Sequence, residues 1–204
     1  MPNPDITLHG LRLSGHSHRA ELFLSLLRLP YRFVEALPPT AELLRLNPLG
    51  QIPVLTDGEA VIPDSNAILV YLAARYAPGG PWMPGDPEGA AAVQRWLSIA
   101  AGEVRFGPAL ARLMVVFGAP ADRETVHATA ARVLAFMEAH LGDRTFLAAA
   151  RPTLADIACY SYVAHAPEGG VSLAPYPAVR SWLGRIEALP GFIAMPASPI
   201  PGEG

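Results

Sequence analysis

Residues 47–72 read NPLGQIPVLTDGEAVIPDSNAILVYL, and this stretch decides the fold of the 204-residue chain. Two short apolar segments, 53–56 and 60–62, are separated by Asp57-Gly58, a dipeptide typical of a tight hairpin turn. Both segments are of strand length and contain the β-branched residues that strands favour. The stretch therefore opens with a predicted β-hairpin.

A helix is predicted directly after the hairpin. Asp64 or Ser65 can act as its N-cap, and the apolar periodicity continues to Tyr76. Upstream of the stretch we predict a strand at 5–9, a helix at 18–29, a strand at 31–36 and a short helix at 41–46. A strand–helix–strand unit is expected to form a parallel pair with a right-handed crossover.

The remaining two thirds of the chain has a helical pattern. Residues 77–89 are dense in Pro and Gly and mark a boundary, so we predict domains at 1–77 and 89–204 with a linker at 78–88. The second domain is expected to contain a long helix at 89–117 bent at Pro108, helices at 123–141, from Thr153 onward and at 177–189, and an extended tail at 194–204.

This order of elements is that of a thioredoxin-like domain followed by a helical domain. Residues 47–72 resemble the central signature of cytosolic glutathione transferases, and residues 152–160, PTLADIACY, resemble a helix-start motif in the second domain of that family. The resemblance implies a fold class of α/β thioredoxin-like N-terminal domain plus all-α helical bundle. It also implies a cytoplasmic homodimer of the serine type, with glutathione as co-substrate and a small hydrophobic electrophile as the second substrate.

Ile52-Pro53 stands at the start of a predicted strand. Proline has no N–H to donate to a sheet, so it belongs at such a start. An X-Pro bond is usually trans, but the resemblance implies that Pro53 is cis. A cis turn would leave the N–H and C=O of Ile52 facing outward, where an extended peptide such as glutathione can pair with both.

Asp64-Ser65 is the second predicted binding element. Free N–H groups and the positive end of a helix dipole lie at a helix start, which makes it an anion site. In the family, the γ-glutamyl carboxylate meets the backbone N–H and hydroxyl of the serine that Ser65 matches, while the residue matching Asp64 lies near the amino group. The same residues also serve as an ordinary helix cap. Gln51 is a weaker ligand candidate, or a polar loop residue.

The loop before the first helix contains the predicted catalytic hydroxyl. Serine-type relatives use a hydroxyl here to stabilise the glutathione thiolate. Lowering a thiol pKa of about 8.5 by two units needs about 2.7 kcal/mol. One hydrogen bond to a charged group contributes roughly 1.5–3 kcal/mol, and a helix N-terminus adds roughly 0.3–1 kcal/mol. One hydroxyl near a helix end is therefore sufficient.

Two serines compete for this role. Ser14 best matches the position after the strand and loop, whereas Ser17 is expected to cap the helix but lies within reach of the same site. His16 and His18 are either donors to the thiolate or solvent-facing polar residues. No third ligand is evident for a metal site, and none is predicted.

The wall of the second-substrate site is expected to come from the long helix. The candidates are Ala101, Glu103, Val104, Arg105, Phe106 and Gly107, followed by Arg112, Met114 and Phe117. For the charged members, the alternative is an ordinary salt-bridged helix surface. Two departures from the family stand out. Arg28 replaces the usual glycine after the first helix, and the short connection 37–42 offers no Lys or His to hold the glycine end of the peptide. Arg45 is either the substitute for that basic residue or an ordinary surface residue.

Composition narrows the function classes. The net charge of −3 favours neither nucleic acid nor an anionic membrane as a partner. Cys159 is the single cysteine, so an internal disulfide is impossible, and all fifteen basic residues are arginine, which excludes Schiff-base lysine chemistry. Neither a signal peptide nor a membrane span is predicted. The alternatives to transfer are glutathione-dependent isomerisation or reduction, and a transferase-like binding or scaffold protein.

Overall fold

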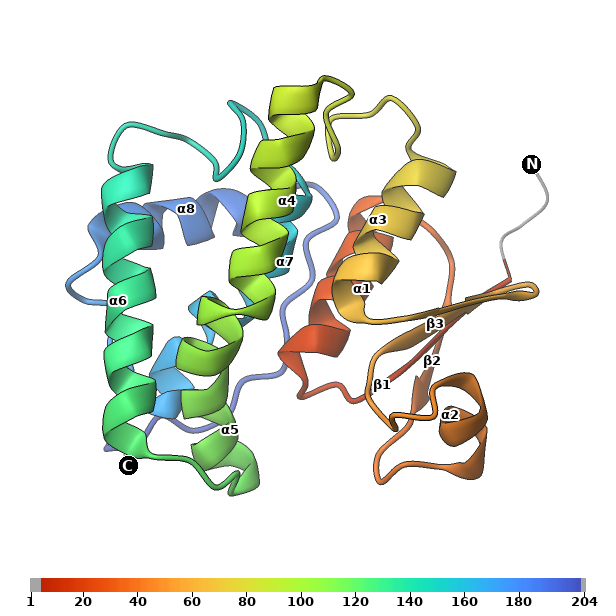
Figure 1. Cartoon of the computed structure of the whole chain (residues 1–204), viewed down its shortest axis with the longest axis horizontal. Coiled ribbons are helices and arrows are strands. Elements are labelled where there is room, and N and C mark those ends of the chain that lie inside the picture. The colour runs from red at the N-terminus through yellow and green to blue at the C-terminus, as the bar shows by residue number, and fades with distance from the viewer. Residues whose placement is uncertain (1–4, 203–204) are drawn as a thin grey trace.

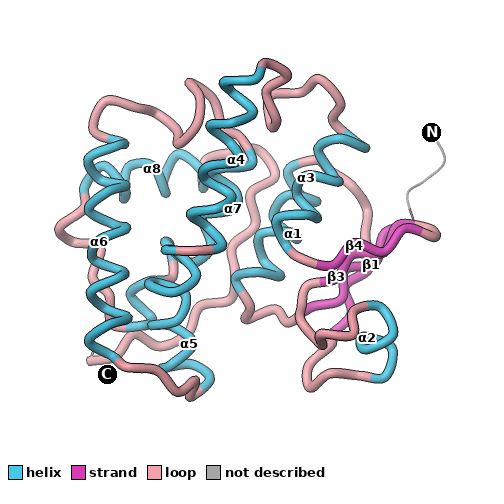
Figure 2. The backbone as a smooth tube through the Cα atoms, in the orientation of Figure 1, coloured by secondary structure: helices cyan, strands magenta, loops and turns pink. Residues whose placement is uncertain are grey.

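A four-stranded sheet lies beside a larger group of helices in the computed structural model, which describes residues 5–202 (Figures 1 and 2). The strands are β1 Ile6–Gly10, β2 Arg32–Glu35, β3 Val54–Asp57 and β4 Ala60–Pro63, in the order β2-β1-β3-β4. β1 pairs with β2 in parallel and with β3 antiparallel, and β3 pairs antiparallel with β4. The predicted parallel pair and the predicted hairpin are both confirmed.

Three helices belong to the sheet part: α1 Gly15–Leu26, α2 Ala41–Leu46 and α3 Ser65–Tyr76. α1 and α3 pack against each other between the sheet and the remaining helices (Figure 1). α2 lies away from them and packs through Leu43 on a small separate cluster with Ala36 and Val54. The first part of the chain is therefore the expected thioredoxin-like arrangement.

Helix α1 begins and ends earlier than the sequence pattern predicts. Its N-cap is Ser14, not Ser17, because the Ser14 hydroxyl accepts a hydrogen bond from the Ser17 N–H at 3.4 Å. After the helix ends, Arg28 adopts a left-handed conformation with φ of 54°, and the Leu29 N–H returns to the Leu24 carbonyl. The position that usually carries glycine therefore requires the conformation that glycine adopts without strain.

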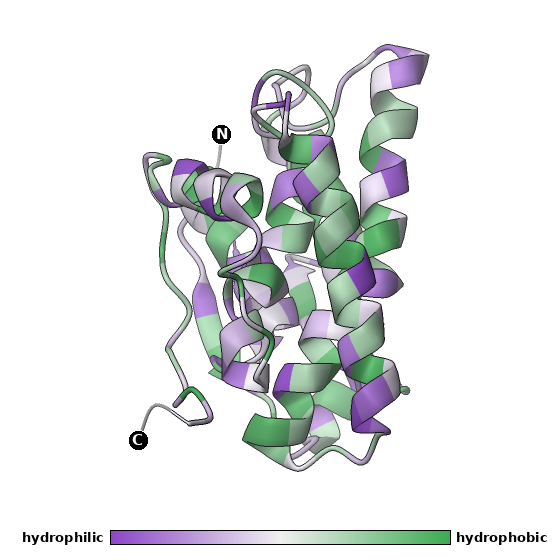
Figure 3. Ribbon diagram, turned by 90° about the vertical axis from the view of Figure 1, so that its left-hand side faces the viewer, coloured by the Kyte–Doolittle hydropathy of each residue, from purple (hydrophilic) through white to green (hydrophobic). Residues whose placement is uncertain are grey.

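The second part of the chain is entirely helical, as predicted. Its α-helices are α4 Pro87–Ala101, α5 Leu110–Phe117, α6 Arg123–Leu141, α7 Leu154–Ala164 and α8 Pro177–Glu187. In Figure 3 several of them carry hydrophobic residues along one side and hydrophilic residues along the other. α7 differs, because every residue from Leu154 to Val163 is buried, so this helix forms the centre of the core.

The prediction of a single long helix at residues 89–117 is wrong, because the helix is interrupted. α4 ends at Ala101, and a π-helical turn at Arg105–Ala109 joins it to α5. Pro108 lies inside this turn, where its missing N–H and its ring disfavour a regular α-helical bond pattern. Gly107 packs so closely on α6 that a Cβ atom there would meet the backbone of Ala130 at 2.8 Å.

The segment that follows α8 runs along both parts of the chain. The Ser25 hydroxyl donates to the Gly191 carbonyl at 2.7 Å, and the Ser198 N–H donates to Glu168 at 3.0 Å. This segment includes the predicted extended tail, of which residues 203 and 204 lie outside the described residues. The connection between α3 and α4, residues 77–86, overlaps the linker that we propose for residues 78–88.

Candidate functional site

A cavity of about 550 Å³ lies where the loops of the sheet part meet the helices. Seven residues are predicted to bind glutathione or to activate its thiol: Ser14, Ser17, Gln51, Ile52, Pro53, Asp64 and Ser65. All of them except Ser17 line the cavity. The wall consists of Leu11, Ser14, His16, Leu37, Gly50, Gln51, Ile52, Pro53, Asp64, Ser65, Ala101, Arg105, Leu113, Phe117 and Tyr162. Both parts of the chain therefore contribute to one candidate site.

The turn at Ile52-Pro53 forms one side of the cavity. The Ile52–Pro53 bond is cis, as the resemblance implies. The register of β3 begins at Val54, so the backbone of Ile52 lies outside the sheet ladder. The Asn47 side chain donates to the Gln51 carbonyl at 3.0 Å and holds the loop in place. The peptide groups of Ile52 are thus presented at the strand entry, beside the cavity.

The start of α3 forms the second side. Asp64 is the N-cap, with φ of 77°, and its carboxylate accepts hydrogen bonds from the N–H groups of Asn66 and Ala67, both at 2.9 Å. Ser65 is the first residue of the helix, so its N–H has no acceptor within the helix. The Ser65 hydroxyl accepts from Arg19 Nη1 at 3.3 Å and lies 3.3 Å from His16 Nδ1.

The two candidate hydroxyls occupy different environments. Ser14 lies in the cavity wall at the start of α1. Ser17 is fully buried, and its hydroxyl accepts a hydrogen bond from the Leu11 N–H at 3.1 Å. A Cβ atom on Gly10 would lie 2.6 Å from that hydroxyl, so Ser17 is enclosed between β1 and α1. This placement favours Ser14 as the group that faces a ligand.

The two histidines of the loop, His16 and His18, also lie in different environments. His18 is buried, with Nε2 2.9 Å from the Ile193 carbonyl and Nδ1 2.9 Å from the Ser161 hydroxyl. Because a carbonyl only accepts, Nε2 carries the hydrogen. Burial lowers the pKa of His18 to about 4. The interpretation of His18 as a solvent-facing residue is therefore wrong, since it connects α1 to α7 and to the C-terminal segment.

His16, in contrast, faces the cavity. Its ring packs edge-on against Tyr162, with the ring centroids 4.9 Å apart. Burial, and then the positive charges of Arg19 and Arg105, lower the pKa of His16 well below its usual value. The imidazole is neutral at neutral pH, so it offers one N–H donor and one acceptor to its surroundings.

Only some of the residues predicted for the wall of the second-substrate site line the cavity. Ala101, Arg105 and Phe117 line the cavity. Val104 and Gly107 are buried in helix packing instead, and the Phe106 side chain is 58% exposed. Of the remaining candidates, Glu103 is exposed, Met114 is half-buried, and Arg112 is buried and paired with Glu168 at 2.5 Å. The prediction is wrong for these residues, which do not line the cavity.

Comparison with known proteins identifies the family. The family model of the glutathione S-transferase N-terminal domain matches residues 8–82, and that of the C-terminal domain matches residues 108–190. The chain is 32% identical to glutathione S-transferase 3 of Zea mays over 219 residues, covering 97% of this chain and 98% of the relative. The chain belongs to the glutathione S-transferase family.

Other members of the glutathione S-transferase family agree with this assignment. Theta-2 of Homo sapiens is 32% identical over 159 residues, which cover 74% of this chain and 65% of the human protein. The glutathione S-transferase of Pseudomonas fluorescens has a TM-score of 0.85 at 31% identity, covering 93% of this chain and 98% of that one. A theta-class enzyme of Xanthomonas axonopodis, solved with glutathione bound, has a TM-score of 0.80 at 27% identity, covering 92% and 95%.

Tyr162 is a cavity residue of this family member that the sequence analysis missed. A Cβ atom on Gly15 would lie 2.8 Å from the Tyr162 ring, so glycine is required where α1 begins. Tyr162 lies in α7, whose residues are apolar or small on all sides, and such a pattern does not indicate which side chain faces a cavity. Leu11 and Leu37 in loops and Leu113 in α5 were also missed, because no local pattern distinguishes an apolar cavity residue from one in the core.

The glycyl end of a bound peptide has no assigned partner. Arg45 lies on α2, is exposed, and does not line the cavity. The prediction that Arg45 replaces the family's basic residue is therefore not supported by its position. The cavity wall nearest to α2 is made by Leu37 and Gly50, and these residues offer backbone groups rather than a charge.

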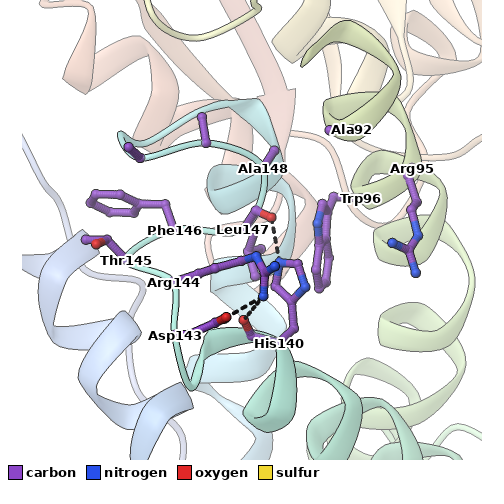
Figure 4. A pocket seen from close by; sticks show the side chains of 12 residues that line it. Ala92, Arg95, Trp96, His140, Asp143, Arg144, Thr145, Phe146, Leu147 and Ala148 are labelled. Atoms are coloured by element: carbon purple, nitrogen blue, oxygen red, sulfur yellow. Dashed lines mark hydrogen bonds and ion pairs between the residues drawn. The ribbon is translucent and has the colours of Figure 1, made fainter. Parts of the chain in front are cut away.

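A second hollow of about 470 Å³ lies between α4 and the segment that joins α6 to α7 (Figure 4). Arg144, Asp143 and His140 already have partners in the protein, and the Arg95 guanidinium lies over the Phe136 ring at 5.4 Å. Arg144 donates to Asp143 at 2.5 Å and to the His140 carbonyl at 3.1 Å, and His140 Nε2 lies 2.8 Å from the Leu147 carbonyl. We therefore assign no chemistry to this hollow.

Residues 5–202 contain neither a metal-binding cluster nor a membrane-spanning helix by the following observations. No group of three or more His, Cys, Asp or Glu side chains is placed to hold a metal ion. No helix within this range combines the length and the apolar character needed to cross a lipid bilayer.

Proposed function

We propose that this chain is a glutathione transferase that activates the glutathione thiol as a thiolate for attack on a small hydrophobic electrophile. One observation carries the proposal: Ser14, the Ile52-Pro53 turn and the Asp64-Ser65 helix start line a single cavity, although they are far apart in sequence. That cavity combines an edge for an extended peptide, an anion site and a hydroxyl.

The peptide would lie between the two polar sides of the cavity. The γ-glutamyl carboxylate would meet the N–H and hydroxyl of Ser65, where the positive end of α3 stabilises an anion. The peptide groups beside the cysteine would pair with the backbone of Ile52 as an added strand. Gln51 lies next to this edge and can contribute a further hydrogen bond.

The thiolate would be stabilised by Ser14. Its hydroxyl accepts a weak bond from the Ser17 N–H and keeps its own hydrogen free to donate. A hydrogen bond to a charged sulfur contributes roughly 1.5–3 kcal/mol, which corresponds to a pKa lowered by about one to two units. The thiolate, once formed and positioned, is the nucleophile, so the protein needs no covalent nucleophile of its own.

The second substrate would occupy the helical side of the cavity. Leu113, Phe117 and Tyr162 supply apolar and aromatic surface there, and Arg105 supplies a charge at its edge. A cavity that is mostly apolar with a few polar groups is typical of sites for small molecules. The family's detoxifying role and a cytoplasmic location are parts of this proposal.

Two chains are proposed to associate as a homodimer. Large apolar side chains are exposed near β4, α3 and the preceding loop: Leu49 at 78%, Val61 at 41% and Val70 at 39%. A hollow of about 540 Å³ lies between α3 and α4 beside Val70. Exposed large apolar side chains are available to be buried in such an interface. Light scattering should give the mass of a dimer, and Leu49→Asp should shift it toward the monomer.

Three measurements test the proposed activity. Calorimetry should detect glutathione binding at millimolar concentration or below, and its absence there would refute the proposal. Ultraviolet absorbance should show a lowered thiol pKa for the bound peptide, whereas an unshifted thiol favours a non-catalytic binding protein. Mass spectrometry of products separates conjugation, which adds the whole tripeptide, from isomerisation or reduction, which regenerates it.

A further inference from the structure

Arg19 lies beneath the anion site and has an unusual environment. Its side chain is 1% exposed, and it comes from α1, whose N-terminal residues line the cavity. Nη1 donates to the Ser65 hydroxyl at 3.3 Å and to the Asn66 side-chain oxygen at 2.8 Å. Asn66 is itself fixed, because its amide nitrogen donates to the Leu97 carbonyl of α4 at 3.0 Å.

The Arg19 guanidinium has hydrogen-bond partners for only one of its three nitrogen atoms. Its Nε and Nη2 atoms are buried without a hydrogen-bond partner, and among residues 5–202 no carboxylate forms an ion pair with it. Asp64 is the carboxylate whose charge acts on it, and that carboxylate is engaged with the N–H groups of α3. A buried charge without a paired partner carries a large desolvation cost.

Arg19 contrasts with the other buried arginine of the chain. Arg112 is fully buried as well, but it is paired with Glu168 and donates to the Leu13 carbonyl at 2.7 Å and to Ser198 at 3.3 Å. The protein therefore neutralises one buried arginine internally and leaves the other one uncompensated, directly behind the hydroxyl of Ser65.

We propose that Arg19 is a positioning residue whose missing counter-charge is supplied by the ligand: its positive charge acts through Ser65 and makes the site select a carboxylate over a neutral group. This inference rests on the proposed function and adds to it the basis of selection at the γ-glutamyl end. Arg19 fixes the Ser65 hydroxyl as an acceptor on its inner side, and the hydroxyl hydrogen is available to a ligand in the tautomer in which His16 Nδ1, 3.3 Å away, carries its own hydrogen. In the low dielectric of the interior, the charge reaches the cavity with little screening.

The electrostatics of the cavity agree with this arrangement. Arg19 and Arg105 both act on His16, which faces the same cavity, and both disfavour its protonated form. The field of Arg19 therefore extends to the cavity side of Ser65. An incoming carboxylate is stabilised by the same field that destabilises a second cation.

The test combines a change in the protein with a matched change in the ligand. The ligands are glutathione and its analogue in which the γ-glutamyl α-carboxylate is a carboxamide. The proteins are the wild type, Arg19→Met and Arg19→Gln, which keeps amide donors but no charge. Arg75→Met is the control, since Arg75 is exposed on α3 and its loss changes the net charge equally. Calorimetry gives each Kd.

The wild type and the control should bind glutathione at least tenfold more tightly than the amide. Both Arg19 variants should reduce this ratio at least fivefold. The ratio compares two ligands on the same protein, so a change in stability that affects both ligands equally does not alter it. An unchanged ratio in Arg19→Gln would overturn the inference, because Arg19 would then serve only to pack α1 against α3.

The same data separate this inference from the proposed function. Wild-type protein that binds both peptides equally would leave glutathione binding intact and refute the selection by Arg19. Wild-type protein that binds neither peptide at millimolar concentration would refute both.

Discussion

The hydroxyl of Ser65 lies 3.3 Å from Nδ1 of His16, and this contact joins the first turn of α3 to the first turn of α1. The N-terminal residues of two helices therefore meet at one cavity, and the positive end of each helix dipole lies there. Such a site suits a ligand that carries negative charge at two places. Glutathione bound as a thiolate has a carboxylate at one end and a charged sulfur near its middle.

Ser14→Ala should reduce the rate while leaving glutathione affinity nearly unchanged. Loss of one hydrogen bond to a charged sulfur raises the thiol pKa by about one to two units, so the rate at neutral pH should fall roughly 10- to 100-fold. Absorbance titration of the bound thiol and steady-state kinetics measure both effects.

Ser17→Ala is the matched control for that change. It removes the acceptor of the buried Leu11 N–H and should lower the free energy of unfolding by about 1–3 kcal/mol. The thiol pKa should not move. Ser17 would replace Ser14 as the catalytic candidate if Ser17→Ala raised the thiol pKa and Ser14→Ala did not.

Ser65→Ala should weaken glutathione binding about tenfold, which is equivalent to roughly 1.4 kcal/mol. The variant keeps the backbone N–H and the helix end but loses the hydroxyl that we propose to bind the carboxylate. Calorimetry measures the Kd directly. A Kd equal to that of the wild type would place the carboxylate elsewhere in the cavity.

Phe117→Ala should raise KM for the electrophile without changing the Kd for glutathione, because Phe117 lines only the helical side of the cavity. Loss of a half-exposed aromatic contact should cost roughly 1 kcal/mol, or about fivefold in KM. Val115→Ala serves as the control, since Val115 is exposed on the same helix and does not line the cavity. Equal effects of both changes would contradict the assignment.

His18 should make the protein less stable in mild acid. Its pKa is about 4 in the folded state and 6.5 when unfolded, so the unfolded state binds more protons between these values. The stability contributed by neutral His18 is complete above pH 6.5 and is lost as the pH falls toward 4, by up to roughly 3 kcal/mol.

Urea unfolding as a function of pH tests this expectation. His18→Gln keeps hydrogen-bonding groups near Ser161 and Ile193 but has no proton to gain. The free energy of unfolding of the variant should therefore depend less steeply on pH between 6.5 and 4. Identical slopes in the two proteins would show that His18 does not account for the acid sensitivity.

Arg28→Gly should stabilise the protein by about 1 kcal/mol. Arg28 occupies the left-handed region at the end of α1, where a residue with a Cβ atom is strained by roughly 1–2 kcal/mol and glycine is not. Arg28→Ala removes the same side chain but keeps the Cβ atom, so it should bring no gain. Thermal unfolding of the two variants distinguishes relief of strain from loss of the charge.

Local patterns in the sequence determined the elements and most of the peptide side of the site. Asp57-Gly58 predicted the hairpin, and the helix start at Asp64-Ser65 predicted the anion site, because turns and caps depend on residues adjacent in the chain. The resemblance added the cis bond before Pro53 and the family, and the comparisons confirm the family.

Tertiary structure decided which side chains share the cavity. Ser14 and Ser17 are equivalent by sequence distance, and only packing against β1 encloses Ser17. The sequence does not indicate that Tyr162 faces a cavity or that Arg19 is buried, and both follow from the packing of α7 and α3 against α1. A sequence pattern reports which residues share a face of one element, whereas burial, charge pairing and cavity walls depend on how several elements meet, and those contacts form between residues far apart in the chain.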